Sequence, residues 1–404
     1  MNAPLSAADV PAGFTFAAAH CGLKRSRLDL GILISEEPAV AAAVFTGNLV
    51  AAAPVIASRE HIKKSRQSMR GLIVNSGNAN CCTRVDGYPA SIATATHLAR
   101  QLLSDPSQFV VCSTGVIGPA LRVEKIIAAI PQLVQSRSAE PGAFEEFARA
   151  IMTTDTRPKW AAASCFLDGK KVRLLGCAKG SGMIQPNMAT MLGFIATDAS
   201  ISAAMLDRAL RSMVNSTFNS ITVDGDTSTN DTVAIFANGQ SGARKIASAS
   251  SADYKTFCGA LERICMSLAL SIVEDGEGAQ RVIEIEVRGA KTEAAARRIA
   301  ETVATSPLVK TAFAGADPNW GRIFAAAGRA GVPFEPERVD ITMAGIPVLR
   351  RGQPLDFNER AASNRLLADH VPIVMHLHAG AARARYWTCD FTAEYVRINA
   401  SYRT

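Results

Sequence analysis

The sequence predicts an α/β or α+β fold with a large hydrophobic core. Segments with helical periodicity alternate with short apolar runs along the chain, which is the pattern of sheets covered by helices. Of the 404 residues, 48% are hydrophobic and 20% are charged, a balance that excludes disordered and fibrous classes. A chain of this length divides into roughly two or three domains and needs no disulfide or metal to stabilise its core.

The first half of the chain is expected to alternate between buried strands and amphipathic helices. An Ala- and Val-rich run, residues 39–57, is interrupted by a turn-forming Gly-Asn pair. The runs Leu72–Val74 and Phe109–Cys112 predict buried strands. Residues 90–104 and 124–135 carry helical periodicity. Each predicted strand is therefore followed by a loop and a predicted helix.

The last third of the chain predicts a second, smaller sheet. Val282–Val287 alternates apolar and acidic residues, as a strand with one buried face does. Lys291–Ala304 is rich in Glu, Ala and Arg and predicts a helix, and Leu308–Ala312 predicts a further strand, so that the three form a βαβ-like unit. Val339–Met343 and Ile373–His378 predict two more strands of this sheet.

Charge and cysteine usage exclude several classes of function. The chain has 43 Lys and Arg against 36 Asp and Glu, a net charge of +7, without any basic block longer than a pair, so nucleic acid is not an expected partner. Nine cysteines without a CxxC pair disfavour a disulfide scaffold or a zinc ribbon, and no metal site is expected. No apolar run reaches the ~18 residues of a membrane span, and the N-terminus lacks the pattern of a secretion signal. We therefore expect a cytoplasmic protein without a membrane partner.

The segment Lys179–Asp198 carries the clearest sign of chemistry. Its glycines lack the spacing of a P-loop and of a nucleophile elbow. A polar, turn-rich stretch leads instead to Thr190 and an apolar strand. N-terminal nucleophile enzymes use this arrangement: the hydroxyl attacks the preceding carbonyl, here that of Ala189, and the freed α-amino group then serves as a base. A β-branched strand residue without a catalytic role fits the same pattern.

Three other segments are more polar than packing requires. Ser113-Thr114-Gly115 offers a hydroxyl and a glycine amide after a strand, a pair that can stabilise an oxyanion. Met152–Lys159 gathers hydroxyls, a carboxylate and cations. Asn219–Thr232 holds three Asp, two Asn and four Thr, but it lacks the Glu that ends an EF-hand loop. Local turns explain Asn219–Thr232 as well as a substrate site does, and loops of the composition Ser113-Thr114-Gly115 are usually only turns.

The sequence resembles the ornithine acetyltransferase (glutamate N-acetyltransferase) family of arginine biosynthesis along nearly its whole length. The hallmark segment is KGSGMIQPNMATMLGFIATDA, residues 179–199. Further family-like segments occur in the expected order: VFTGNLVAAAPVIASREHI, VNSGNAN, STGVIG, MTTDTRPK, ITVDGDTSTNDT, SPLVKTAFAG, DPNWGRI and CDFTAEYVRINASYRT. The combination is far more specific than any one of these motifs. One departure is Ser401, where the family's ending usually has an acidic residue.

The resemblance implies an enzyme that cleaves its own chain. The cut falls between Ala189 and Thr190, giving an α chain of residues 1–189 and a β chain of residues 190–404. Residues 190–280 then complete the core, and residues from about 281 to 404 form a smaller α/β subdomain whose C-terminal tail lies over the site. Thr190 takes the acetyl group of N2-acetyl-L-ornithine as an ester and passes it to L-glutamate, a ping-pong reaction that yields L-ornithine and N-acetyl-L-glutamate.

The resemblance also assigns roles to individual residues. Thr114 and Gly115 fall on the family's oxyanion hole. Its substrate-binding positions correspond to Thr153, Lys179, Thr190, Glu277, Asn399 and Thr404. A lysine suits the α-carboxylate that ornithine and glutamate share, because charge-assisted hydrogen bonds are strong. A glutamate suits the side-chain ammonium of ornithine.

The expected fold is a layered α/β sandwich of the N-terminal-nucleophile-like ornithine acetyltransferase type, with a smaller C-terminal α/β subdomain. Its cleaved pieces stay intertwined and commonly assemble as an α2β2 heterotetramer. No cofactor is expected; some family members also use acetyl-CoA as a co-substrate, and the sequence leaves this choice open. Two alternatives stay open as well: a relative that acts on another N-acyl amino acid or as an amidohydrolase, and an uncut binding protein with the same fold.

Overall fold

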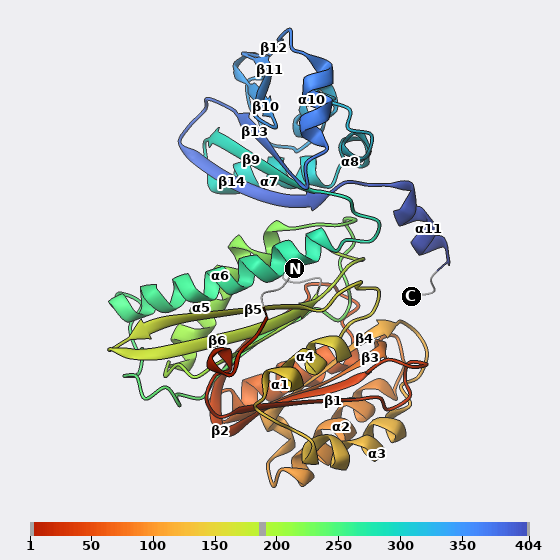
Figure 1. Cartoon of the computed structure of the whole chain (residues 1–404), viewed down its shortest axis with the longest axis vertical. Helices are drawn as coiled ribbons and strands as arrows, with labels where there is room; N and C mark the ends of the chain where they lie inside the picture. The colour runs from red at the N-terminus through yellow and green to blue at the C-terminus, as the bar shows by residue number, and fades with distance from the viewer. Residues whose placement is uncertain (1–3, 186–190, 402–404) are drawn as a thin grey trace. The chain divides into compact units, whose positions relative to one another are not determined.

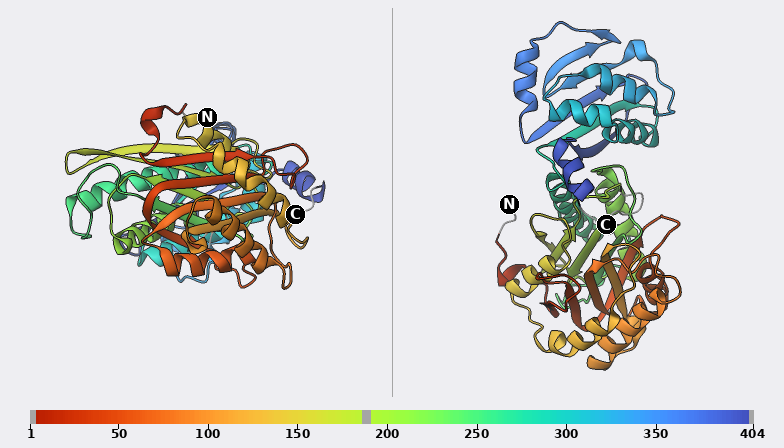
Figure 2. Two further views of the ribbon diagram at one scale, coloured as in Figure 1. Left: turned by 90° about the horizontal axis from the view of Figure 1, so that it is seen from below. Right: turned by 90° about the vertical axis from the view of Figure 1, so that its right-hand side faces the viewer.

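The computed structural model describes residues 4–185 and 191–401. Contacts divide the chain into two compact units. The first unit holds the described residues up to Asn219 together with Asp226–Ile272, and the second holds Ser220–Gly225 and the described residues from Val273 on. Each unit is a sheet covered by helices (Figures 1 and 2), which confirms the expected mixed α/β class.

The first unit is built on an eight-stranded sheet. Its order is β4-β3-β2-β8-β7-β6-β5, and β1 pairs with β2 at its side. The strands are β1 (Phe14–Ala19), β2 (Leu30–Phe45), β3 (Met69–Asn78), β4 (Phe109–Val116), β5 (Lys159–Leu167), β6 (Lys170–Lys179), β7 (Leu192–Thr197) and β8 (Thr232–Ala237). β2 belongs to both halves of the sheet, because its first part pairs with β3 and its last part, Val40–Phe45, pairs with β8.

The helices of the first unit lie in layers around this sheet (Figure 1). They are α1 (Ala53–Ser65), α2 (Gly87–Gln101), α3 (Val123–Gln135), α4 (Pro141–Ala150), α5 (Ala203–Ser216) and α6 (Ala252–Glu274), with short 3-10 turns at Ala7–Asp9, Pro106–Gln108 and Phe218–Ser220. One hydrophobic cluster takes Val110 from one half of the sheet and Phe194 from the other, so the two halves pack face to face. On the outer face of the first half, Leu98 of α2 and Ile130 of α3 are buried. The result is the expected layered sandwich.

Helix α6 covers the outer face of the other half of the sheet. A Cβ atom on Gly176 of β6 would lie 3.2 Å from Ile264 and 3.3 Å from Leu268 of this helix. Among the described helices, α6 alone is long and apolar enough, by length and composition, to cross a membrane. Half of its apolar window is buried inside the protein, which is how a core helix passes the same test.

The second unit is built on a six-stranded sheet of order β12-β11-β10-β13-β9-β14. Its strands are β9 (Val282–Ala290), β10 (Asp340–Met343), β11 (Ile346–Arg350), β12 (Gln353–Pro354), β13 (His370–His376) and β14 (Ala382–Cys389). Its helices are α7 (Glu293–Ala304), α8 (Pro307–Ala314), α9 (Trp320–Gly328), α10 (Glu359–Leu366), α11 (Ala393–Ser401) and a 3-10 turn at Pro336–Arg338. β9 and β13 pair in parallel, and the other neighbours pair antiparallel. The predicted smaller sheet is therefore confirmed.

One predicted strand of this unit is wrong. Leu308–Ala312 belongs to α8, which begins with Pro307 at its first turn. Val309, Ala312 and Phe313 are buried, a spacing of three and four residues that places them on one face of a helix. A short apolar run does not distinguish such a helix from a strand.

Candidate active site

The ends of four strands meet at one edge of the first unit. Lys179, the last residue of β6, lies opposite Leu192 at the start of β7. Leu192 pairs with Thr232 at the start of β8, and Thr232 pairs with Phe45 at the end of β2. The same edge therefore holds these end residues and their next neighbours along the chain. They include Lys179, Met191, Asp231 and Thr46.

Thr114 and Gly115 lie near the end of β4, which runs parallel to β3. The register of this pair shifts at Asn78, and β-bulges of this kind disrupt the regular ladder of a sheet. Gly115 has φ +129°, and a Cβ atom on it would lie 2.4 Å from the carbonyl carbon of Gly77. Only glycine fits this close approach of two backbones. The predicted oxyanion pair thus lies where strand pairing becomes irregular.

Lys179 contacts Thr114 across the site. Its Nζ donates a hydrogen bond to the Thr114 hydroxyl oxygen at 3.4 Å, and both residues are 9% exposed. Because the hydroxyl accepts this bond, its own proton is directed elsewhere. Two of the predicted site residues, from different halves of the sheet, therefore come together.

Asn230 explains part of the polar segment Asn219–Thr232. Its side-chain nitrogen Nδ2 donates hydrogen bonds to the backbone carbonyls of Ala79 at 2.6 Å and Ser113 at 2.8 Å. The Thr229 hydroxyl donates to the Asn230 side-chain oxygen at 2.6 Å. Asn230 thus ties the loop after β3 to β4, one residue before Thr114.

Asp155 holds together the segments that carry Thr153 and Lys179. Its Oδ2 accepts the Thr153 amide at 2.9 Å, and its Oδ1 accepts the Gly180 amide at 2.7 Å and Lys159 Nζ at 2.6 Å. Burial raises the pKa of Asp155, but the ammonium groups of Lys159 and Lys179 and these hydrogen bonds lower the pKa further, to well below its usual range. Asp155 is therefore a buried carboxylate that fixes the backbone beside two predicted substrate-binding residues.

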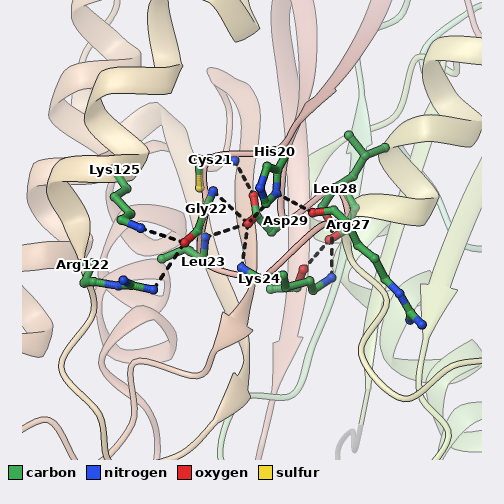
Figure 3. Close-up of polar contacts among 12 residues, drawn as sticks. His20, Cys21, Gly22, Leu23, Lys24, Arg27, Leu28, Asp29, Arg122 and Lys125 are labelled. Atoms are coloured by element: carbon green, nitrogen blue, oxygen red, sulfur yellow. Dashed lines mark hydrogen bonds and ion pairs between the residues drawn. The ribbon is translucent and has the colours of Figure 1, made fainter.

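A loop closed around Asp29 brings Lys24 to the same region (Figure 3). The fully buried Asp29 carboxylate accepts the four successive amides of residues 21–24 at 2.6 to 3.1 Å. Lys24 Nζ donates to the carbonyl of Leu28 at 3.1 Å and to that of Met152 at 2.6 Å, next to Thr153. Burial lowers the pKa of Lys24 to about 8, although the charge of Asp29 opposes this.

Asp231 is a second buried carboxyl group at this edge. It is 2% exposed, and its Oδ2 accepts no hydrogen bond from any described residue. Burial raises the pKa of Asp231 well above its usual range, although hydrogen bonds from Ser228 and from the Met191 amide, and the charge of Lys179, lower it in part. An acid in this environment retains its proton more readily than an exposed aspartate.

Glu277 and Asn399 come together in the second unit. Asn399 Nδ2 donates to Glu277 Oε2 at 2.8 Å, and Glu277 is 7% exposed. Helix α11, which carries Asn399, has its first turn packed against Gly278. The φ angle of Gly278 is +73°, and a Cβ atom there would lie 2.6 Å from the backbone nitrogen of Tyr395. The Thr392 hydroxyl donates to the Gly278 carbonyl at 2.8 Å. The tail up to Ser401 is thus a docked helix.

The remaining predicted site residues lie outside the described part of the chain: Ala189, Thr190 and Thr404. Four polar residues of the site region were not singled out from the sequence, namely Lys24, Asp155, Asn230 and Asp231. The last three lie in the two Asp- and Thr-rich segments, whose polarity was the only available signal. Within residues 4–185 and 191–401, no group of three or more His, Cys, Asp and Glu side chains is arranged to hold a metal ion.

Comparison with known proteins places this chain in a family. The family model described as "ArgJ family" matches residues 15–404. The chain is 46% identical to the arginine biosynthesis bifunctional protein ArgJ of Thermotoga neapolitana, over 98% of this chain and 100% of that protein. It is 44% identical to the protein of the same name from Oceanobacillus iheyensis, over 98% of this chain and 95% of that one. A crystal structure of arginine biosynthesis bifunctional protein ArgJ from Bacillus halodurans aligns with a TM-score of 0.51 and 44% identity, over 52% of this chain and 98% of that chain. The chain therefore belongs to the ArgJ family.

Proposed function

We propose that this chain is an acetyltransferase of arginine biosynthesis that moves the acetyl group of N2-acetyl-L-ornithine to L-glutamate through an ester on Thr190. The proposal rests on the family and on one geometric observation, the contact of Lys179 with Thr114, which lies opposite the register shift at Asn78. That contact puts a cation suited to a carboxylate next to a hydroxyl and an amide suited to an oxyanion.

Self-cleavage comes first in this proposal. The Thr190 hydroxyl attacks the carbonyl carbon of Ala189, the peptide C–N bond breaks, and the Thr190 nitrogen takes a proton. Water then hydrolyses the resulting ester and frees the hydroxyl beside a new α-amino group. The solved Bacillus halodurans chain supports this step, because 52% of the present chain covers 98% of it. A chain of that length is what one fragment of a cut relative would be.

Acetyl transfer then takes two steps at the same oxygen. The hydroxyl attacks the acetyl carbon of acetylornithine, the amide C–N bond breaks, and ornithine leaves with the proton on its nitrogen. The amine of glutamate attacks the acetyl ester, and the proton it loses returns to the Thr190 oxygen. The Thr114 hydroxyl and the Gly115 amide would donate to the oxyanion in both steps, and Lys179 and Thr153 would bind the substrate carboxylate. Glu277 and Asn399 would bind the ornithine ammonium.

The name of the relatives, a bifunctional protein of arginine biosynthesis, extends the proposal. We take acetyl-CoA as a second acetyl donor, which adds amino-acid N-acetyltransferase activity without a bound cofactor. The two cleaved chains would assemble as an α2β2 heterotetramer in the cytoplasm. A native mass of twice the full chain, with two unequal bands after denaturation, is the expected result.

Thr190→Ala tests the nucleophile directly. We expect this variant to remain uncut and to transfer no acetyl, because both reactions need the same hydroxyl. Thr197→Ala is the matched control, since Thr197 lies at the other end of β7 and its hydroxyl donates to the Arg173 carbonyl; it should still be cut. Intact mass during turnover should show one added acetyl group on the downstream fragment of the wild type. A wild-type chain that transfers acetyl while uncut and unacetylated would refute the proposal.

Thr114→Ala tests the oxyanion hole. Removal of one donor of this kind lowers kcat by roughly 10²–10³-fold. We expect slower cleavage and slower transfer, with little change in melting temperature. Unchanged rates would exclude Thr114 from the mechanism. In all these assays, hydrolysis of acetylornithine without glutamate as the main activity would instead support an amidohydrolase.

A further inference from the structure

Lys24 carries a charge for which the described residues offer no acidic partner. Its Nζ donates to the carbonyls of Leu28 at 3.1 Å and Met152 at 2.6 Å, and an ammonium group has three hydrogens to donate. Within residues 4–185 and 191–401, no carboxylate lies within ion-pair distance of this ammonium, and its third hydrogen has no acceptor. Because Lys24 is half-buried, its charge would attract an anion more strongly than that of an exposed lysine.

The stem of Lys24 lies over the strand pair that carries the predicted oxyanion hole. A Cβ atom on Gly77 of β3 would lie 3.1 Å from Lys24 Cγ, and Gly77 is the register partner of Gly115 of β4. The φ of Gly77 is +95°, so glycine both permits this backbone and leaves room for the stem. The ammonium end reaches Met152, the residue before Thr153 (Figure 3). Lys24 therefore extends from the Gly77–Gly115 pair toward a predicted substrate-binding residue.

Two lysine ammonium groups repel each other in this region. Burial lowers the pKa of Lys24 most, and the charges of Arg27 and Lys179 lower it as well, whereas the charges of Asp29 and Asp155 raise it. Both carboxylates already accept other donors: four backbone amides at Asp29, and another lysine with two backbone amides at Asp155. An anion bound between Lys24 and Lys179 would be attracted by both ammonium groups and would relieve their repulsion.

The α-carboxylate of an amino acid matches this set of donors. Its two oxygens accept charge-assisted hydrogen bonds from ammonium groups and further bonds from hydroxyls. It is attached to the same carbon as the acetylated nitrogen, so it has to lie close to the oxyanion hole, as Lys24 does. The side-chain carboxylate of glutamate lies further from the acetyl group along the substrate.

We propose that Lys24 binds the α-carboxylate that acetylornithine and glutamate share, together with Lys179 and Thr153. The inference rests on the proposed function and deepens it, because it adds a second cation to the carboxylate site. Both half-reactions would use this cation, whichever side chain the substrate carries.

Lys24→Met tests the inference, because it keeps an apolar stem over Gly77 and removes the charge. We expect kcat/KM for acetylornithine and for glutamate to fall, each by about ten- to a hundredfold, since one charge-assisted hydrogen bond is lost. The value of kcat at saturation should change little, because the lost contact is present in the ground state and the transition state alike. Lys24→Arg, which keeps the charge, should recover part of the loss.

Lys125→Met is the matched control. Lys125 of α3 (Val123–Gln135) also ties the loop of residues 21–24, because its Nζ donates to the Gly22 carbonyl at 2.9 Å. This variant should leave both kcat/KM values unchanged. An equal fall in Lys125→Met would show that Lys24 only fixes the loop. Unchanged values in Lys24→Met, or a fall for glutamate alone, would likewise overturn the inference.

A second measurement uses the wild type and so does not depend on the folding of a variant. Cyanate carbamylates the Lys24 amine at mildly alkaline pH, and the mass of the peptide that contains it reports the extent. Saturating N-acetylglutamate should protect Lys24, whereas N-acetyl-4-aminobutyrate, the same molecule without its α-carboxylate, should not. Absence of protection by N-acetylglutamate, or equal protection by both compounds, would overturn this inference alone. A wild type that transfers no acetyl would overturn the proposed function itself.

Discussion

Asp155 and Asp231 lie in the same unit and are buried to the same degree, at 3% and 2% exposure, but they differ in how firmly they hold a proton. The Asp155 carboxylate accepts a hydrogen bond from the Lys159 ammonium at 2.6 Å and hydrogen bonds from two backbone amides. Asp231 has neutral donors at one oxygen and no described partner at the other. The same burial therefore leaves one group ionised and favours a proton on the other, so partners decide the charge of a buried acid.

This difference separates two tasks at one strand edge. A paired carboxylate fixes geometry, because breaking it would leave buried ammonium and amide groups uncompensated. A buried acid with a raised pKa, whose second oxygen has no described partner, is instead the kind of group that is found at functional sites. This division can be tested through the stability of the folded chain, which does not depend on the proposed reaction.

Asp155→Ala should have the largest effect. It leaves the Lys159 ammonium, whose side chain is 1% exposed, without its carboxylate. Removing one partner of a buried pair costs about 3–5 kcal/mol, and we expect that loss in the free energy of unfolding from urea titration. The pKa of Asp155 is lowered in the folded state, so its contribution is present above the unfolded-state pKa and is lost as pH falls through the folded-state value.

A surface pair gives the control for this measurement. Asp207 and Arg211 of α5 form an ion pair at 2.8 Å with both side chains substantially exposed. Asp207→Ala should cost less than about 1 kcal/mol. If Asp155→Ala were equally mild, Asp155 would not hold the site together.

Asp29→Ala should have an intermediate effect. Its carboxylate has four amide donors, and among the described residues no lysine or arginine lies within ion-pair distance of it. We expect a loss of roughly 2–3 kcal/mol, because the loop amides can turn to water once the acceptor is gone. Limited proteolysis should then cut residues 21–28 faster than in the wild type. Resistance of this loop to protease in the variant would contradict the role of Asp29.

Asp231→Asn should have the smallest effect, with the opposite sign. The pKa of Asp231 is raised in the folded state, so its contribution is fully present below the unfolded-state pKa and is lost as pH rises through the folded-state value. Asn cannot ionise and removes that loss, so the variant should be more stable than the parent at neutral pH, and the difference should vanish at acidic pH. The comparison is best made in the uncut Thr190→Ala background, as melting temperature at pH 5 and pH 8. Parallel pH curves for the two proteins would show that Asp231 is ionised.

The secondary structure that the sequence predicted best was the structure with an unambiguous period. The apolar runs at Leu72–Val74 and Phe109–Cys112 lie within β3 and β4, and the alternating run at Val282–Val287 lies within β9. The run at Leu308–Ala312 failed because five residues do not establish a period. The long β2, which joins both halves of the sheet, left no distinctive pattern, since its middle is polar and exposed.

The site was harder to predict than the strands. Thr114 and Lys179 are 65 positions apart, and nothing in their spacing shows that they touch. The resemblance to a family identified both as site residues. Asp155 and Asn230, which hold them in place, lie in polar segments that local turns could equally explain. A contact made by tertiary folding leaves no trace in local periodicity, so the partners of a buried acid have to be seen in the structure.

The strand order has a final consequence for a chain that is cut before β7. β8 and β7, from the downstream piece, are inserted between β2 and β6, from the upstream piece. Six residue pairs join β2 to β8, and six join β6 to β7. Neither fragment could dissociate without breaking the strand pairs in the middle of the sheet. The unpaired strand edges that this would expose are prone to aggregation. After a cut at this point the two fragments would stay associated and would remain one cooperative folding unit. Such a unit has to be synthesised as a single precursor.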